Sequence, residues 1–124
     1  MGRFIIKKLD EGIQFFLAAG NREVIAASAK YNSKASCMKG ISSVVRNAPV
    51  ASVEDKTCRK SEKEINPKFE IFKDEDGLFR FVLRAKNGQT VISSEGYKAK
   101  ASCKNGIESV KKNASNSEIV DMCL

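Results

Sequence analysis

The sequence predicts an α+β fold built from two tandem repeats, each with the order β-β-β-α-β. Two observations support this: the sequence matches itself at an offset of 66 residues, and each copy passes from alternating apolar residues to helical spacing. The composition, with 42% hydrophobic and 30% charged residues, is typical of a soluble globular protein. A chain of 124 residues can close one hydrophobic core, and we expect the two repeats to form one folded unit.

The strongest internal match joins residues 31–48 to residues 97–114. Both segments read Tyr-x-x-Lys-Ala-Ser-Cys-x-x-Gly-Ile-x-Ser-Val-x-x-Asn-Ala, which is eleven identities in eighteen positions. Before Gly12 the offset becomes 65, which indicates that the first copy lacks one residue in a turn. We therefore predict a first repeat over residues 1–58, a polar linker over 59–67 that ends with Asn66-Pro67, and a second repeat over 68–124.

The strands are clearest in the second copy. Residues 69–72 form one apolar run, the turn 74–77 ends it, and residues 79–85 alternate so that one face carries Phe79, Phe81, Leu83 and Ala85. Asn87-Gly88 predicts a tight hairpin before a third strand at 90–93, because both residue types tolerate a positive φ. The first copy has Gly20-Asn21 at the corresponding place.

Helical spacing follows in each copy, over residues 34–47 and the matching segment of the second copy. The predicted buried stripes are Cys37, Ile41, Val44 and Ala48 in one helix and Cys103, Ile107, Val110 and Ala114 in the other. Ser33 can cap the first helix and Ala99 cannot cap the second. Gly40 and Gly106 predict close packing of helix on sheet, and short β-prone stretches follow at 50–53 and 118–121.

Several segments of the second copy together resemble the YegP-like family of bacterial domains of unknown function. They are Phe69-Glu70-Ile71-Phe72-Lys73-Asp74, Asn87-Gly88, Ser94-Glu95-Gly96-Tyr97 and Lys100-Ala101-Ser102-Cys103-x-x-Gly106-Ile107-x-Ser109-Val110-x-x-Asn113-Ala114. The resemblance implies a single antiparallel sheet with the helices packed on one face. It also implies that the strand after each helix is exchanged between the repeats, so that 50–56 pairs with the second copy and 118–123 with the first. The family has no established activity, and no catalytic residue is carried over.

The cysteines do not predict a catalytic or metal site. The chain has no histidine, and Cys37, Cys58, Cys103 and Cys123 are far apart with no C-x-x-C pair, so we expect no zinc site and no cofactor. Cys37 and Cys103 lie near helix N-termini, where a thiol can become a nucleophile, but their place on the apolar stripe favours a core role. A disulfide involving Cys58 or Cys123 stays open, with free thiols as the expectation.

The net charge of the chain and two parts of the predicted sheet suggest binding surfaces. The net charge of +7 favours weak attraction to polyanions, and Arg80, Arg84 and Lys86 on one hairpin could contact a phosphate backbone. The alternative is a solvated sheet face. Phe16 and Ala18 make the outer face of the first copy more apolar, which is either ordinary surface or a patch for another protein or for a second molecule of the chain.

These features favour a small non-enzymatic binding or scaffolding module, with a nucleic-acid-binding protein that uses a basic sheet face as the alternative. The apolar run near the N-terminus spans only three residues, too short for a signal peptide or a membrane span, so we expect a cytoplasmic protein. Because the chain holds both repeats, we expect a monomer.

Overall fold

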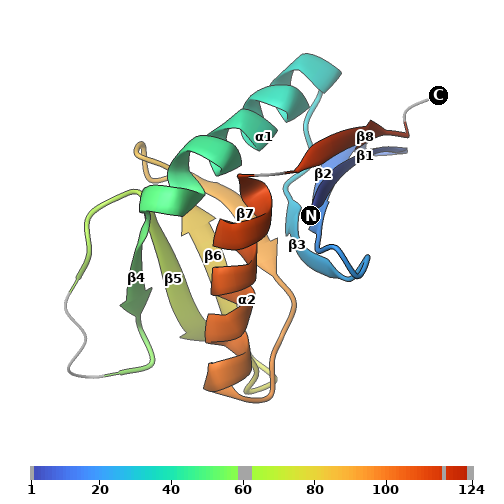
Figure 1. Cartoon of the computed structure of the whole chain (residues 1–124). Helices are drawn as coiled ribbons and strands as arrows, with labels where there is room; N and C mark the ends of the chain where they lie inside the picture. The colour runs from blue at the N-terminus through green and yellow to red at the C-terminus, as the bar shows by residue number, and fades with distance from the viewer. Residues whose placement is uncertain (1, 59–62, 116, 123–124) are drawn as a thin grey trace.

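The computed structural model describes residues 2–58, 63–115 and 117–122, which form one eight-stranded sheet and two α-helices (Figure 1). The strand order is β4-β5-β6-β7-β3-β2-β1-β8. In chain order the elements are β1 (Arg3–Leu9), β2 (Gly12–Ala18), β3 (Val24–Ser28), α1 (Lys34–Asn47), the 3₁₀ turn η1 (Ala48–Val50), β4 (Ser52–Asp55), β5 (Lys68–Lys73), β6 (Phe79–Arg84), β7 (Thr90–Ser94), α2 (Lys100–Ala114) and β8 (Glu118–Asp121).

The predicted β-β-β-α-β order is confirmed in both repeats, but the expectation of an all-antiparallel sheet is wrong. The six central strands pair antiparallel, and β3 meets β7 at the middle of the sheet. At the two edges β4 runs parallel to β5 and β8 runs parallel to β1. Parallel neighbours cannot be joined by a tight hairpin, and here each parallel pair joins strands from different repeats.

Both helices pack on one face of the sheet and enclose a continuous core. Each predicted stripe is buried, as are the inward side chains of the strands: Phe4, Ile6, Phe15, Leu17, Phe69, Ile71, Phe81 and Leu83. The two halves repeat even their ring contacts, because Phe4–Phe15 and Phe69–Phe81 both meet edge to face with centroids 5.8 Å apart. The sequence repeat is therefore also a repeat of side-chain packing in the core.

The starts of the helices and their glycines agree with the sequence. The Ser33 hydroxyl accepts a hydrogen bond from the Ser36 N–H, whereas Ala99 provides no side-chain cap. A Cβ at Gly106 would lie 2.6 Å from the Tyr97 hydroxyl oxygen and 3.0 Å from Cε2 of Phe81, and Gly40 meets Tyr31 and Phe15 in the same way. Both glycines are needed because the helix presses against an aromatic ring.

The hairpin turns differ from the expectation. Of the two predicted turn residues of the second repeat, Gly88 has a positive φ, at 84°, and Asn87 does not. The Gly88 N–H donates to the carbonyl of Ala85, which leaves a single left-handed position at the end of the turn. In the first repeat that position is taken by Arg22, with φ 72°, and not by Gly20 or Asn21.

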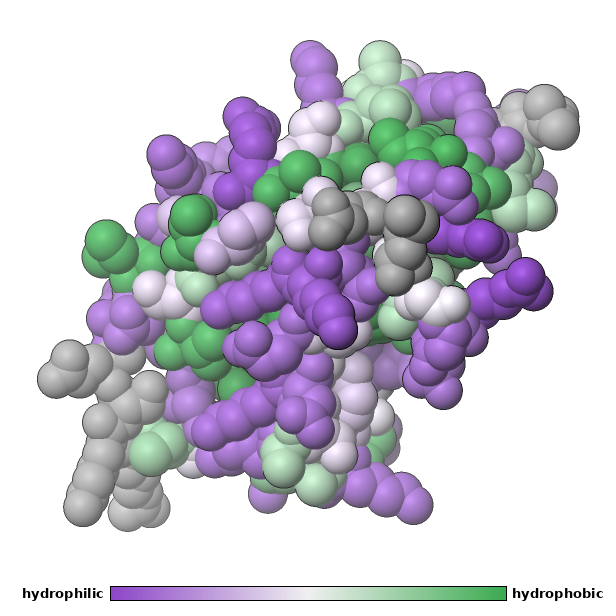
Figure 2. All heavy atoms as spheres, in the orientation of Figure 1, coloured by the Kyte–Doolittle hydropathy of each residue, from purple (hydrophilic) through white to green (hydrophobic). Residues whose placement is uncertain are grey.

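Neither helix in the described ranges is long and apolar enough to cross a membrane. On the side that carries α2, the surface over this helix is mostly hydrophilic, while hydrophobic residues gather between α1 and β8 (Figure 2).

Candidate functional site

The face of the sheet that points away from the helices, the outer face, has two chemically different halves. One row of cross-strand neighbours runs across all eight strands in the order Glu54, Glu70, Val82, Ser93, Ala27, Phe16, Ile5 and Val120. The row is acidic at β4 and β5 and apolar at β2, β1 and β8. The two repeats share one fold but place chemically different side chains at equivalent positions of the outer face.

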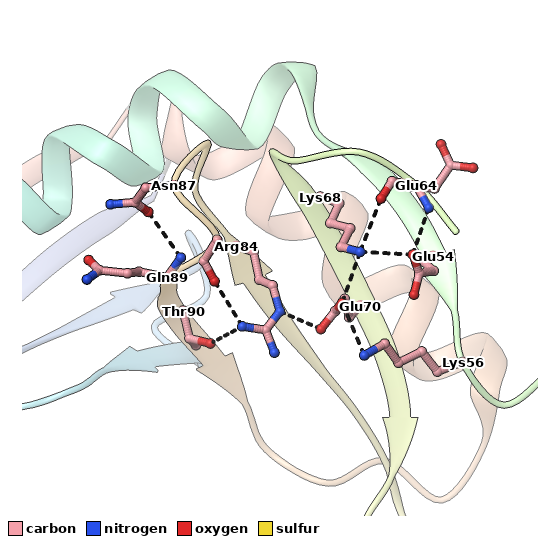
Figure 3. Close-up of polar contacts among 10 residues, drawn as sticks. Glu54, Lys56, Glu64, Lys68, Glu70, Arg84, Asn87, Gln89 and Thr90 are labelled. Atoms are coloured by element: carbon pink, nitrogen blue, oxygen red, sulfur yellow. Dashed lines mark hydrogen bonds and ion pairs between the residues drawn. The ribbon is translucent and has the colours of Figure 1, made fainter. Parts of the chain in front are cut away.

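The charged half holds a cluster of five side chains: Glu54, Lys56, Lys68, Glu70 and Arg84 (Figure 3). Lys68 Nζ lies 2.9 Å from Glu54 Oε1 and 3.2 Å from Glu70 Oε2, and Arg84 Nε lies 2.6 Å from Glu70 Oε1. Glu54, Lys68 and Glu70 are buried. The backbone of Glu64 closes the cluster, because its N–H donates to Glu54 and its carbonyl accepts from Lys68.

The charges of this cluster stabilise one another. Burial raises the pKa of Glu70, but hydrogen bonds from Arg84, Lys68 and Lys56 outweigh it and lower the pKa from 4.5 to about 2. The hydrogen bond from Lys68 lowers the pKa of Glu54, and the same bond raises the pKa of Lys68. Glu54, Lys68 and Glu70 are therefore charged at neutral pH, and their partners lie within the protein.

The three residues predicted to contact an anion are not brought together as a free cationic site. Arg80 Nε lies 2.6 Å from Asp74 Oδ2, and Arg84 is bound to Glu70 within the charged cluster. Arg80 also donates to the carbonyl of Ser94, and Arg84 to that of Gly88. Lys86 is exposed in the turn between β6 and β7. The two arginines therefore serve mainly to hold strands and turns.

A shallow hollow of about 470 Å³ lies at the middle of the outer face, where β3 meets β7. Both repeats contribute to it, with Gln14 and Phe16 on one side and Arg80 and Glu95 on the other. Gln14 and Arg80 occupy equivalent positions, and each donates to the carbonyl of an equivalent serine, Ser28 or Ser94. The hollow thus lies on the pseudo-twofold axis of the repeats, with an uncharged wall from the first repeat and a wall from the second repeat that carries Arg80 and Glu95.

Beside the hollow lies the apolar patch, which consists of Ile5, Phe16, Val24, Ala27 and Val120. Val24 is 42% exposed, and the other four are half-buried. The Lys7 ammonium lies over the Phe16 ring, 5.5 Å from its centroid. Ala18, which the sequence also placed on this surface, is buried.

Comparison with known proteins identifies the family. The model for the domain of unknown function DUF1508 matches residues 10–55 and again 74–121. This chain belongs to the DUF1508 family. The UPF0339 protein YegP of Yersinia pestis is 39% identical over 125 residues, which cover 100% of this chain and 98% of that protein. The UPF0339 protein Atu5359 of Agrobacterium fabrum is 63% identical over 54 residues, 44% of this chain but 87% of that protein, so it spans a single repeat.

Two solved structures share the fold over nearly the whole chain. The solution structure of yegP from E. coli, a protein of unknown function, has a TM-score of 0.81 and 33% identity, and the match covers 98% of this chain and 93% of that one. UPF0339 protein SO3888 from Shewanella oneidensis has a TM-score of 0.79 and 30% identity, with 98% and 92% covered. The resemblance inferred from the sequence motifs is confirmed.

The two DUF1508 repeats are joined by a pair of reciprocal ion pairs that sequence reasoning missed. Lys100 at the start of α2 lies 2.8 Å from Asp55 of β4, and Lys34 at the start of α1 pairs with Asp121 of β8. Each pair joins the helix of one repeat to the last strand of the other. The signal was present, because both Lys34/Lys100 and Asp55/Asp121 recur at the offset of 66.

The two cysteines of the predicted helical stripes are core residues, in agreement with the sequence. Cys37 and Cys103 are fully buried, Cys58 is exposed, and none of these three forms a disulfide. Burial raises the pKa of Cys103 to about 11, so it stays a thiol at neutral pH. Cys123 lies outside the described residues. Within residues 2–58, 63–115 and 117–122, no group of acidic or cysteine side chains is arranged to hold a metal ion.

Proposed function

We propose that this DUF1508 chain is a non-enzymatic binding module that holds a partner protein on the outer face of its sheet. The observation that carries this proposal is the apolar patch beside the central hollow. Contiguous apolar residues on an exposed sheet face favour protein contact, because water leaves them at a gain in free energy. Phe16 has the largest side chain of the patch and is the expected anchor.

The other half of the outer face is charged where this half is apolar, so the patch does not extend across the whole sheet. There the equivalent positions carry Glu70 in place of Ile5 and Glu54 in place of Val120, and the charges of both carboxylates are satisfied internally. A partner would have to displace buried ion pairs to bind that half, which is unfavourable. The buried thiols, with the pKa of Cys103 raised to about 11, also favour binding over catalysis.

Site-specific photo-crosslinking in cells tests the proposal. The full chain is expressed with p-benzoylphenylalanine in place of Phe16 and irradiated. We expect discrete adducts with another protein that disappear when Ile5→Asp is added to the same chain. The matched control places the probe at Arg46, which is exposed on α1. Absence of adducts from position 16, or the same adducts from position 46, would overturn the proposal.

Nucleic-acid binding is a second candidate, favoured by the net charge of +7. Arg80 and Arg84 are bound to carboxylates, so Lys86 and the exposed Lys104 and Lys112 of α2 are the stronger contributors. Fluorescence anisotropy with labelled DNA and RNA, at low and then physiological salt, tests this. Binding that weakens steeply with salt and with Lys86→Glu supports it, and no binding at low salt excludes it.

We also propose that the repeats exchange their last strands and that the chain is therefore a monomer. The pairing of β4 with β5 and of β8 with β1 supports this, since each repeat then completes the sheet of the other. Sedimentation equilibrium should give a mass of 13.6 kDa. A mass of twice that value would contradict the proposal.

A further inference from the structure

The two edge strands of the sheet occupy equivalent places with opposite chemistry. β4, from the first repeat, puts Glu54 beside Glu70 of β5. β8, from the second repeat, puts Val120 beside Ile5 of β1. Glu54 and Val120 are separated by the repeat offset of 66, so the same position of the fold is filled by a carboxylate at one edge and by an aliphatic side chain at the other.

The β5 edge requires the carboxylate. Glu54 and Glu70 hold the buried ammonium of Lys68 between them, at 2.9 and 3.2 Å, and Glu54 also accepts from the Glu64 N–H at 2.7 Å. With valine in place of Glu54, Lys68 would keep only Glu70 and the Glu64 carbonyl as partners, and the Glu64 N–H would lose its acceptor. Loss of one partner of a buried ion pair is strongly unfavourable.

The β1 edge requires the aliphatic side chain. Val120 lies beside Ile5, and Phe16 is the next residue in the same row. The neighbouring cations are already engaged, because Arg3 Nε lies 2.9 Å from Glu118 Oε1 and the Lys7 ammonium lies over the Phe16 ring. A carboxylate at position 120 would therefore be placed against Ile5 and lose water without gaining a free partner.

We propose that these edges make the two repeats specific for each other: the β5 edge selects the last strand of the first repeat, and the β1 edge selects the last strand of the second. Two copies of the same repeat would then pair poorly. Two first repeats would place Glu54 against the apolar β1 edge, and two second repeats would place Val120 against the charged β5 edge. Specificity arises from the mismatched pairing as much as from the matched one. The inference rests on the observed strand pairings and is independent of any external partner.

Exchange of the two side chains in the full chain tests this. The variant Glu54→Val with Val120→Glu has the same composition and net charge as the wild type. Urea unfolding followed by circular dichroism should show a rise of roughly 100-fold in the unfolding equilibrium constant, given the cost of breaking a buried pair. Each single substitution should also raise it, Glu54→Val more than Val120→Glu because Val120 is only half-buried.

The matched control exchanges the neighbours on the helix side of the same strands, Val53→Ile with Ile119→Val, which are 39% and 46% exposed. These positions are equivalent and both aliphatic, so the unfolding midpoint should change little. A second variant gives the β5 edge the residues of the β1 edge by combining Ser52→Glu, Glu54→Val, Lys68→Arg, Glu70→Ile and Arg84→Ala, so that the new guanidinium at position 68 has the carboxylate partner that Glu118 gives Arg3. It should unfold at higher urea than Glu54→Val alone. An exchanged variant as stable as the control, or a Val120→Glu chain as stable as the wild type, would overturn the proposal.

Discussion

Replacement of Glu70 by glutamine should lower stability at neutral pH and have little effect in strong acid. The Glu70 side chain is only 5% exposed and receives hydrogen bonds or ion pairs from Arg84, Lys68 and Lys56 at 2.6, 3.2 and 3.2 Å. Glutamine has nearly the same shape but no charge. The variant therefore removes the electrostatic contribution and leaves the packing.

The pKa of Glu70 sets the magnitude. Its lowering from 4.5 to about 2 corresponds to about 3 kcal/mol of folding free energy, because a tenfold change in a binding constant equals about 1.4 kcal/mol. Arg84 and Lys56 are partly exposed, so solvent screening reduces this to about 1–2 kcal/mol. Since the folded-state pKa is the lower one, the contribution is present above pH 4.5 and is lost as the pH falls from 4.5 to about 2.

Urea unfolding of the wild type and Glu70→Gln at pH 7, 4 and 2 measures this directly. We expect a difference of about 1–2 kcal/mol in the free energy of unfolding at pH 7 that shrinks toward zero at pH 2. The pKa values of Asp74 and Glu54 are also lowered, so both proteins lose stability in acid, and only the difference between them reports on Glu70. A difference that is the same at pH 7 and pH 2 would refute the assignment.

Three further predictions concern the glycines, the turns and the thiols. Gly106→Ala should destabilise the fold by about 1–3 kcal/mol, because the nearest atom to the new Cβ is the Tyr97 hydroxyl oxygen at 2.6 Å. Adding Tyr97→Phe to the same chain should recover part of the lost stability. No recovery would mean that the Tyr97 ring, and not its hydroxyl, is the obstacle. Arg22→Gly should raise stability by about 0.5–1 kcal/mol, since Arg22 has φ 72°, and a lower melting temperature would contradict this. In a Cys123→Ser chain, a thiol reagent should modify the exposed Cys58 quickly. It should modify the buried Cys37 and Cys103 only when the protein unfolds. Rapid modification of more than one thiol in the native protein would contradict the burial of these two cysteines.

The sequence predicted the elements well and the outer face poorly. The helices, their apolar stripes and the inward residues of the strands depend on local periodicity, and the structure places them as expected. Arg80 and Arg84 were predicted as possible phosphate contacts on one sheet face, and periodicity could show that they share this face but not that Asp74 and Glu70 lie against them. Lys34 and Lys100 recur in the sequence, yet their partners Asp121 and Asp55 belong to the other repeat.

The amino-acid sequence alone determined that this chain is a pair of β-β-β-α-β repeats with one buried face, because side-chain spacing and turn residues act over a few positions. Only the tertiary structure decided that each last strand lies parallel to the first strand of the other repeat. That pairing brings Glu54 to Lys68 and Val120 to Ile5. One half of the outer face is therefore charged, with its charges paired within the protein, and the other half is apolar. These contacts join residues that are remote along the chain, and no local pattern specifies them.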